Sequence, residues 1–283
     1  MRIQTLTTIR PISILIGLLC KRCYAATNVL LLGDSMASFM GKTLESFCSD
    51  VQVKNAGIGG TTADEWAEAT AEIISECADT SFDIVYISVG GNDLLSSDCT
   101  ISSAALVKKI ESAVENIVLN VAPGASTYVL TGYCLPHAPE DEVSGCSEPS
   151  DYNALSFAFS TMQSNGIEVE GSGSNIEIIN SSNVCGGSSI SFSNEMYFQD
   201  PIHLNSKGYC RVFTQETVQK ALSCSDSEDM LNCETVDFEI YGLESNCEHS
   251  QTPNKGGKWT VSQFYRGAAA LWHCMIPLLF TYL

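Results

Sequence analysis

The sequence predicts an α/β protein with a parallel central sheet covered by helices on both faces. Short apolar runs, typical of buried strands, alternate with segments in which apolar residues recur at helical spacing. Each strand-like run stops at Gly, Asp, Asn, Ser or Thr, residues that begin turns. Strands and helices that alternate this regularly indicate parallel strands joined by crossover helices.

The first expected strand runs over residues 28–33 and leads directly to Ser35. It is short, apolar and stopped by Gly33 and Asp34, as expected of a buried parallel strand. Apolar residues at positions 39, 40, 44 and 47 predict a helix immediately behind it. Ser35 therefore lies at a strand-to-helix turn on the carboxyl edge of the sheet, where open α/β sheets bind ligands. Taken alone, this serine is better explained as a helix cap.

A second expected strand, residues 51–55, leads into a glycine-rich turn. Thr62 and Glu65 have the spacing of a capping box and predict a helix start, and positions 66, 69, 73 and 77 mark one face of that helix. The glycines thus lie just before a helix N-terminus, whose free N–H groups can bind an oxyanion. The alternative is that they only form a tight turn.

The remaining expected elements continue the alternation. They are a strand at 82–89, a helix marked by positions 106 to 117, a strand at 126–131, a helix marked by positions 155 to 162, a strand at 175–179 and a weaker helix at 207–222. The 82–89 strand ends in Gly90-Gly91-Asn92-Asp93, and the 126–131 strand is followed by a long loop with Cys134 and Cys146. Since these two cysteines bracket one loop, we expect them to form a disulfide, with a bond to Cys99 as the competing possibility.

Composition limits the classes of partner and the cell compartment. With 14 Lys and Arg against 33 Asp and Glu, the net charge of −19 argues against nucleic-acid binding. Ten cysteines between residues 48 and 247 form a dense, even set, which indicates an oxidising compartment and a secreted protein. The motif at Asn180 is a glycosylation acceptor.

We expect four segments along the chain. Residues 1–26 resemble a secretory signal peptide, although an organelle transit peptide is an alternative. Residues 27–222 form the α/β domain, and 223–260 an acidic, Cys-rich extension held to it by disulfides. The apolar segment 261–283 is either a GPI-attachment signal or membrane anchor, or an amphipathic end packed on the domain.

A possible base lies near the end of the domain. His203 follows Asp200 by three residues in a loop, so the carboxylate can fold back and orient the imidazole. An activated serine needs such a base. Four complementary parts of a site are then expected at one edge of the sheet: Ser35, Gly60, Asn92 and the Asp200–His203 pair.

These motifs resemble those of the SGNH, or GDSL-type, hydrolase family over residues 27–222. The matching stretches are Gly33-Asp34-Ser35, Asn55-Ala-Gly-Ile-Gly-Gly60, Gly90-Gly91-Asn92-Asp93 and Asp200-Pro-Ile-His203. The resemblance implies a flavodoxin-like three-layer α/β/α fold with about five parallel strands. It also implies Ser35 as nucleophile, His203 as base and Asp200 as its orienting group. The oxyanion hole would comprise Ser35, Gly60 and Asn92, with Asp34 structural. Met36-Ala37-Ser38 departs from the family's more frequent Leu-containing continuation, which bears on substrate fit.

The expected function is hydrolysis of acyl esters, small ones or O-acetyl groups on carbohydrate first, with no cofactor and no metal. A lysophospholipase or thioesterase is the alternative within the hydrolases. A secreted binding protein that keeps the fold without turnover is the alternative from another class. Expected partners are therefore a small-molecule, glycan or lipid ester, and a membrane if residues 261–283 attach the chain to one.

Overall fold

The computed structural model describes residues 26–48, 50–77, 81–135, 146, 149–185, 197–200, 202–224 and 233. The expected signal peptide, nearly all of the Cys-rich extension and the C-terminal apolar segment lie outside the described residues. Within the described ranges, none of the helices has the length and apolar character required to cross a bilayer.

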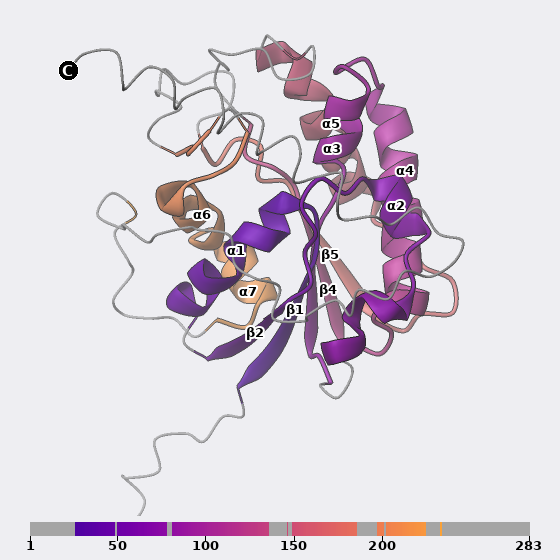
Figure 1. Cartoon of the computed structure of the whole chain (residues 1–283), viewed down its shortest axis with the longest axis vertical. Helices are drawn as coiled ribbons and strands as arrows, with labels where there is room; N and C mark the ends of the chain where they lie inside the picture. Colours follow the sequence, from indigo (N-terminus) through magenta and orange to yellow (C-terminus); the bar gives the residue numbers. More distant parts are fainter. Residues whose placement is uncertain are drawn as a thin grey trace, which may run out of the picture.

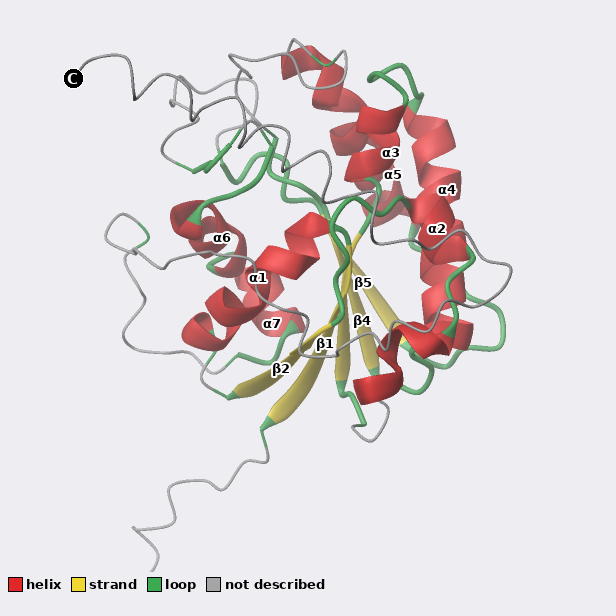
Figure 2. Ribbon diagram, viewed as in Figure 1, coloured by secondary structure: helices red, strands yellow, loops and turns green. Residues whose placement is uncertain are grey.

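The core of the fold is one sheet of five parallel strands (Figure 2). The strands are β1 (Thr27–Gly33), β2 (Val51–Asn55), β3 (Ile84–Ser88), β4 (Thr127–Thr131) and β5 (Asn175–Ile179). Their order, β2-β1-β3-β4-β5, is that of flavodoxin. The prediction of a flavodoxin-like parallel sheet of about five strands is confirmed.

Helices cover both faces of the sheet (Figure 1). One face carries α1 (Ser35–Phe47), α6 (Ser206–Phe213) and α7 (Glu216–Ala221). The other carries α2 (Ala63–Ala67), α3 (Gly91–Ser96), α4 (Ser103–Asn116) and α5 (Asn153–Asn165), with the short turns η2 (Ala71–Cys77), η3 (Ile117–Val121) and η4 (Pro149–Tyr152). The helix after β1 and the helices after β3 lie on opposite faces, so the β1–β3 edge is a topological switch point.

The apolar run of β1 is continuous because the strand is buried on both faces. Val29 and Leu31 pack in the core beneath α1, α6 and α7, whereas Leu30 and Leu32 pack in the core beneath α2 to α5. All four side chains are inaccessible to solvent. A strand at the centre of a parallel sheet requires this pattern, which alternation of polar and apolar residues would not satisfy.

Two predicted helices are interrupted. The helix expected to run from Thr62 through Cys77 ends at Ala67, because the Asn116 side-chain amide donates to the carbonyls of Trp66 and Ala69, 2.8 Å away in each case. A short 3₁₀ turn, η2, carries the rest.

The second interruption divides the helix expected over 207–222 into α6 and α7. Gln215 lies between them with extended backbone angles, and its side-chain amide caps the Val212 carbonyl at 3.0 Å. Conversely, α3 was not among the expected helices; in the structure Gly90 adopts a positive φ of 109° and precedes the first residue of this helix.

Four disulfides join described residues: Cys48–Cys224, Cys99–Cys146, Cys134–Cys185 and Cys210–Cys233. The predicted Cys134–Cys146 bond is therefore wrong. Cys134 is buried in the core beneath α1 and α6, whereas Cys146 is buried in the core beneath α3 to α5. Since the sheet separates the two cysteines, closeness along the chain could not bring them together. The competing bond to Cys99 is the one that Cys146 forms.

Candidate active site

Ser35 is the first residue of α1, directly after the turn that ends β1. The turn is tight because Gly33 has a φ of 129°, and a Cβ there would clash with the Ser88 carbonyl on β3. Asp34 caps α1, accepting a hydrogen bond from the Met36 N–H at 3.0 Å. The described part of the chain offers the Ser35 N–H no acceptor, as is usual in a first helical turn. The backbone thus presents the Ser35 N–H and hydroxyl together at the sheet edge.

The structure brings His203 and Asp200 to this serine. His203 Nε2 lies 2.8 Å from Ser35 Oγ, and His203 Nδ1 lies 2.7 Å from Asp200 Oδ2. The second Asp200 oxygen accepts the backbone N–H groups of Ile202 and His203, at 3.0 and 2.8 Å. Phe39 on α1 contacts the imidazole edge to face, with ring centroids 5.1 Å apart. Ser35, His203 and Asp200 therefore form one continuous hydrogen-bonded chain.

The Asp200 carboxylate is held in its charged form. Burial opposes its ionisation, but the hydrogen bond and charge of His203, together with the two backbone N–H groups, outweigh burial and lower the pKa of Asp200. An ionised carboxylate at this position fixes the imidazole tautomer with its proton on Nδ1. The unprotonated Nε2 then faces the Ser35 hydroxyl and can accept its proton.

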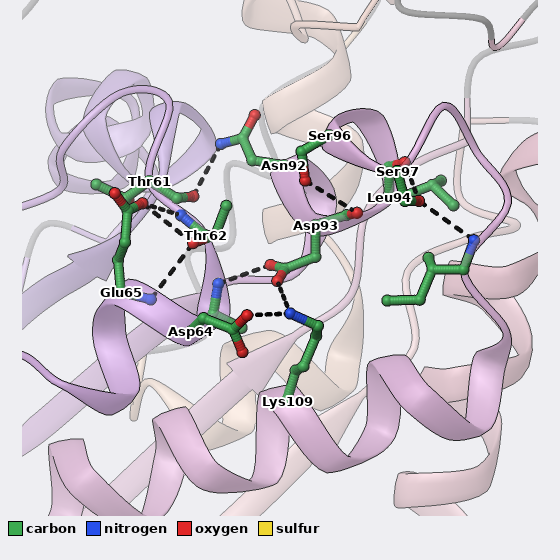
Figure 3. Close-up of polar contacts among 12 residues, drawn as sticks. Thr61, Thr62, Asp64, Glu65, Asn92, Asp93, Leu94, Ser96, Ser97 and Lys109 are labelled. Atoms are coloured by element: carbon green, nitrogen blue, oxygen red, sulfur yellow. Dashed lines mark hydrogen bonds and ion pairs between the residues drawn. The ribbon is translucent and has the colours of Figure 1, made fainter.

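Asn92 lies beside Ser35 and is oriented by the turn that precedes α2. Its side-chain Nδ2 donates to the Thr61 carbonyl at 2.9 Å (Figure 3). Thr61 in turn is held by β1, because its hydroxyl approaches the Gly33 carbonyl at 3.4 Å. Since an amide nitrogen carries two protons, the second Asn92 proton stays available to a substrate oxygen.

Gly60 lies in the same turn, next to Thr61. Its φ of 80° matches the third position of a type II turn, which the Thr61 N–H closes onto the Ile58 carbonyl at 3.3 Å. The described residues offer no acceptor to the Gly60 N–H. Gly59 lies close to the nucleophile, since a Cβ placed on it would be 3.8 Å from the Ser35 Cβ. The turn carrying Gly60 thus runs beside Ser35.

A buried carboxylate, absent from our predicted site, ties these parts together. Asp93 is almost inaccessible to solvent and accepts the Ala63 N–H at 2.6 Å, which joins the starts of α3 and α2 (Figure 3). Lys109 on α4 pairs with both Asp93, at 3.3 Å, and Asp64. Burial raises the pKa of Asp93, against the opposing effects of the Ala63 N–H and the Lys109 charge.

Asp34 is the second buried carboxyl group of the site. Burial raises its pKa to about 6, although hydrogen bonds from the Tyr133 hydroxyl and the Met36 N–H and the charge of His203 favour ionisation. In the described part of the chain, its carboxylate forms a hydrogen bond with neither the Ser35 hydroxyl nor the imidazole; its two partners, the Met36 N–H and the Tyr133 hydroxyl, hold the turn. The expectation that Asp34 is structural agrees with this geometry.

A small cavity of about 40 Å³ opens at Ser35, Asn92 and His203. Its other walls come from α3, the end of β4, η4, the start of α5 and the segment before His203: Leu95, Tyr133, Cys134, Leu135, Tyr152, Leu155 and Ile202. A volume of this size holds only a few water molecules. Tyr133 and Tyr152 were missed, although Tyr133 follows the β4 strand end where such residues are expected.

Comparison with known proteins gives a likeness of fold. No protein-family model matches the chain, and no curated protein matches it. Among solved structures, a carbohydrate esterase family 3 protein from Talaromyces cellulolyticus is 17% identical, with a TM-score of 0.49 over 70% of this chain and 97% of its own. A GDSL-like lipase from Bacteroides thetaiotaomicron VPI-5482 is 14% identical, with a TM-score of 0.47 over 74% and 96%. A member of the lipolytic G-D-S-L family from Veillonella parvula DSM 2008 is 15% identical, with a TM-score of 0.44 over 70% and 97%. The solved structures that this chain is similar to thus include GDSL-type proteins and a carbohydrate esterase.

Proposed function

We propose that the protein is a serine hydrolase of small carboxylic esters. The observation that carries this proposal is the continuous chain from Asp200 through His203 to Ser35, with hydrogen bonds of 2.7 and 2.8 Å. A hydroxyl with a histidine base, itself oriented by a third group, is the arrangement that activates serine for attack on a carbonyl.

In the first half of the reaction, His203 Nε2 takes the Ser35 proton while Oγ attacks the ester carbonyl carbon. The carbonyl oxygen becomes an oxyanion, which the N–H groups of Ser35 and Gly60 and the Asn92 amide stabilise. One such donor contributes about 2.7 to 4 kcal/mol to transition-state stabilisation. The intermediate then breaks its bond to the alcohol oxygen, which leaves with the proton from His203, and the acyl group stays on Ser35.

In the second half, a water molecule replaces the alcohol. His203 takes one proton of that water, and the oxygen attacks the acyl carbon. Collapse of the second oxyanion breaks the bond to Ser35 Oγ, which recovers its proton from His203, and the carboxylic acid leaves. Asp200 stays ionised throughout and stabilises the imidazolium that forms in both halves.

Cavity size supports a short acyl group, since the cavity beside the nucleophile has a volume of only about 40 Å³. O-acetyl esters of carbohydrates are our first candidates for the natural substrate. The alternative hydrolase, a lysophospholipase or thioesterase, requires a long acyl chain or a thioester. The non-catalytic alternative, a secreted binding protein, has no use for an aligned Ser35 and His203.

The test combines a fluorophosphonate probe with p-nitrophenyl esters of increasing acyl length. Ser35 is expected to be the labelled residue, and kcat/KM is expected to peak at two to four carbons, by about tenfold or more over eight. Ser35→Ala and His203→Ala should abolish labelling. Ser38→Ala, on the same helix, is the matched control and should label as the native protein does. Labelling that survives Ser35→Ala would contradict the proposal, and a maximum at long chains would favour the lipase alternative.

A further inference from the structure

Tyr133 connects two parts of the candidate active site that lie on different elements. It follows β4 by two residues and lines the cavity at Ser35. Its hydroxyl donates a hydrogen bond to the Asp34 carboxylate, in the turn between β1 and α1. Since Asp34 directly precedes Ser35, this hydrogen bond helps to fix the backbone that carries the nucleophile.

The ring of the same tyrosine lies against the start of α3. Gly91 is the first residue of this helix, and a Cβ placed on it would be 2.9 Å from Tyr133 Cε1 and 3.1 Å from Cζ. A glycine at this position lets the ring come this close without displacement. Asn92 is the next residue, so the ring supports the helix start that carries an oxyanion donor.

Tyr133 is itself held by its neighbours. Its ring packs edge to face on Phe159 of α5, with the two ring centroids 6.2 Å apart. The next residue in the chain, Cys134, is joined by a disulfide to Cys185. Burial, together with the charge and the hydrogen bond of Asp34, raises the pKa of the Tyr133 hydroxyl well above its ordinary value. The phenol therefore keeps its proton at neutral pH and stays a donor to Asp34.

Ser35 and Asn92 begin two different helices, α1 and α3, yet both face one cavity. In ester hydrolysis the Ser35 hydroxyl attacks the carbonyl carbon while the Asn92 amide stabilises the carbonyl oxygen. An error in the separation of the two helix starts would weaken one of these contacts in the transition state.

We propose that Tyr133 is a positioning residue that holds the Ser35 turn and the Asn92 helix start at the separation that the tetrahedral intermediate requires. The proposal rests on the proposed function, because it needs Ser35 and Asn92 to act on one carbonyl group. It assigns the hydroxyl of Tyr133 to the Asp34 turn and its ring to the start of α3, so the residue acts on the reaction without touching the substrate.

The test compares Tyr133→Phe with the native protein on p-nitrophenyl acetate and p-nitrophenyl butanoate. Phenylalanine keeps the ring against Gly91 and Phe159 but removes the hydroxyl that holds Asp34. We expect kcat to fall about tenfold to a hundredfold, by the same factor on both esters, with KM changed less than about threefold. Native kcat, a loss confined to KM, or an unequal effect on the two esters would overturn the proposal.

A matched control separates position from stability. Tyr128 lies on β4, and its buried hydroxyl donates to the Ala122 carbonyl at 2.7 Å, outside the residues that line the cavity. Tyr128→Phe also loses a tyrosine hydrogen bond and should keep the native kcat. If kcat falls equally in Tyr128→Phe and Tyr133→Phe, then lost stability lowers the activity and the proposal is overturned.

A double-mutant cycle measures whether Tyr133 acts through Asp34. Asp34→Ala removes the carboxylate, so adding Tyr133→Phe to this variant should lower kcat by less than about twofold further. A further fall as large as the one in the native background would contradict the proposal. Failure of the underlying function looks different: the native protein turns over neither ester and the fluorophosphonate leaves Ser35 unlabelled. In that case the assignment of Tyr133 falls together with the hydrolase.

Discussion

Replacing Asp93 with alanine should lower activity indirectly, by displacing Asn92. Among the described residues, the Asp93 side chain forms no hydrogen bond with Asn92 itself. Its carboxylate joins the first residues of α2 and α3 through the Ala63 N–H, 2.6 Å away (Figure 3). Asn92 is the neighbour of Asp93 on α3. Its side-chain amide donates to the carbonyl of Thr61, two residues before Ala63. Without Asp93, the two helix starts can separate, and the Asn92 amide and the Gly60 turn lose their common position.

The expected loss of stability and the expected fall in kcat both follow from these contacts. The variant leaves the buried Ala63 N–H without its acceptor, which costs about 1 to 3 kcal/mol. For a domain of this size, a loss of about 2 kcal/mol lowers Tm by roughly 4 to 8 °C. Misplacing one oxyanion donor costs up to about 2.7 to 4 kcal/mol of transition-state stabilisation, a fall in kcat of about 10² to 10³. KM should change little, because the donor acts on the transition state.

The assay measures kcat, KM and Tm for Asp93→Ala beside a matched control, Asn116→Ala. Asn116 also ties α2 to α4 through two hydrogen bonds, but at the far end of α2, on Trp66 and Ala69. The control should lose stability to a similar extent and keep its kcat. If both variants lose kcat equally, or if Asp93→Ala is fully active at a lowered Tm, then Asp93 does not position the oxyanion donors.

Three further predictions follow from the described contacts. Asp34 has its pKa raised to about 6, so the folded state binds more protons than the unfolded one between about pH 4 and 6, and stability from this group falls as the pH rises. From pH 4 to pH 7, the free energy of unfolding of Asp34→Asn should therefore rise by about 3 kcal/mol relative to that of the native protein, as measured in denaturant titrations. A difference that does not change with pH would contradict this. Replacing Cys48 and Cys224 by serine opens a loop of 176 residues and should cost about 5 kcal/mol on the chain-entropy model, measured as a lower urea midpoint; an unchanged midpoint would refute it. Peptide mapping without reduction should find Cys134 joined to Cys185, and a Cys134 peptide joined to any other cysteine would show that the described pairing is wrong.

Much of the fold could be predicted because parallel sheets leave a strong local signal. Leu30 and Leu31 point to opposite faces, yet both are buried, so the strand is apolar throughout and easily recognised. The site could be predicted for a related reason. Ser35 and Asn92 follow neighbouring parallel strands, whose carboxyl ends meet at one edge.

What could not be predicted depends on contacts between distant segments. The end of α2 is determined by Asn116, 50 residues after Trp66, and nothing near Ala67 signals it. The cysteine pairing depends on the face of the sheet beneath which Cys134 and Cys146 are buried, information that spacing does not contain. Tyr152 could not be predicted as a cavity residue for the same reason, because its place in the cavity wall is known only once its neighbours are known.

The Cys48–Cys224 bond has a consequence for the biosynthesis of the protein. Cys48 caps the end of the helix that begins at Ser35, whereas Cys224 follows α7, beyond His203. The ribosome therefore releases Cys48 early and its partner only 176 residues later. During that interval the Cys48 thiol shares the nascent chain with other emerging cysteines, such as Cys77 and Cys99. Correct pairing has to wait for the last helices to dock on the sheet, or has to be restored by thiol–disulfide exchange. The segments that carry the nucleophile and the base are thus covalently joined only after the whole domain has been made.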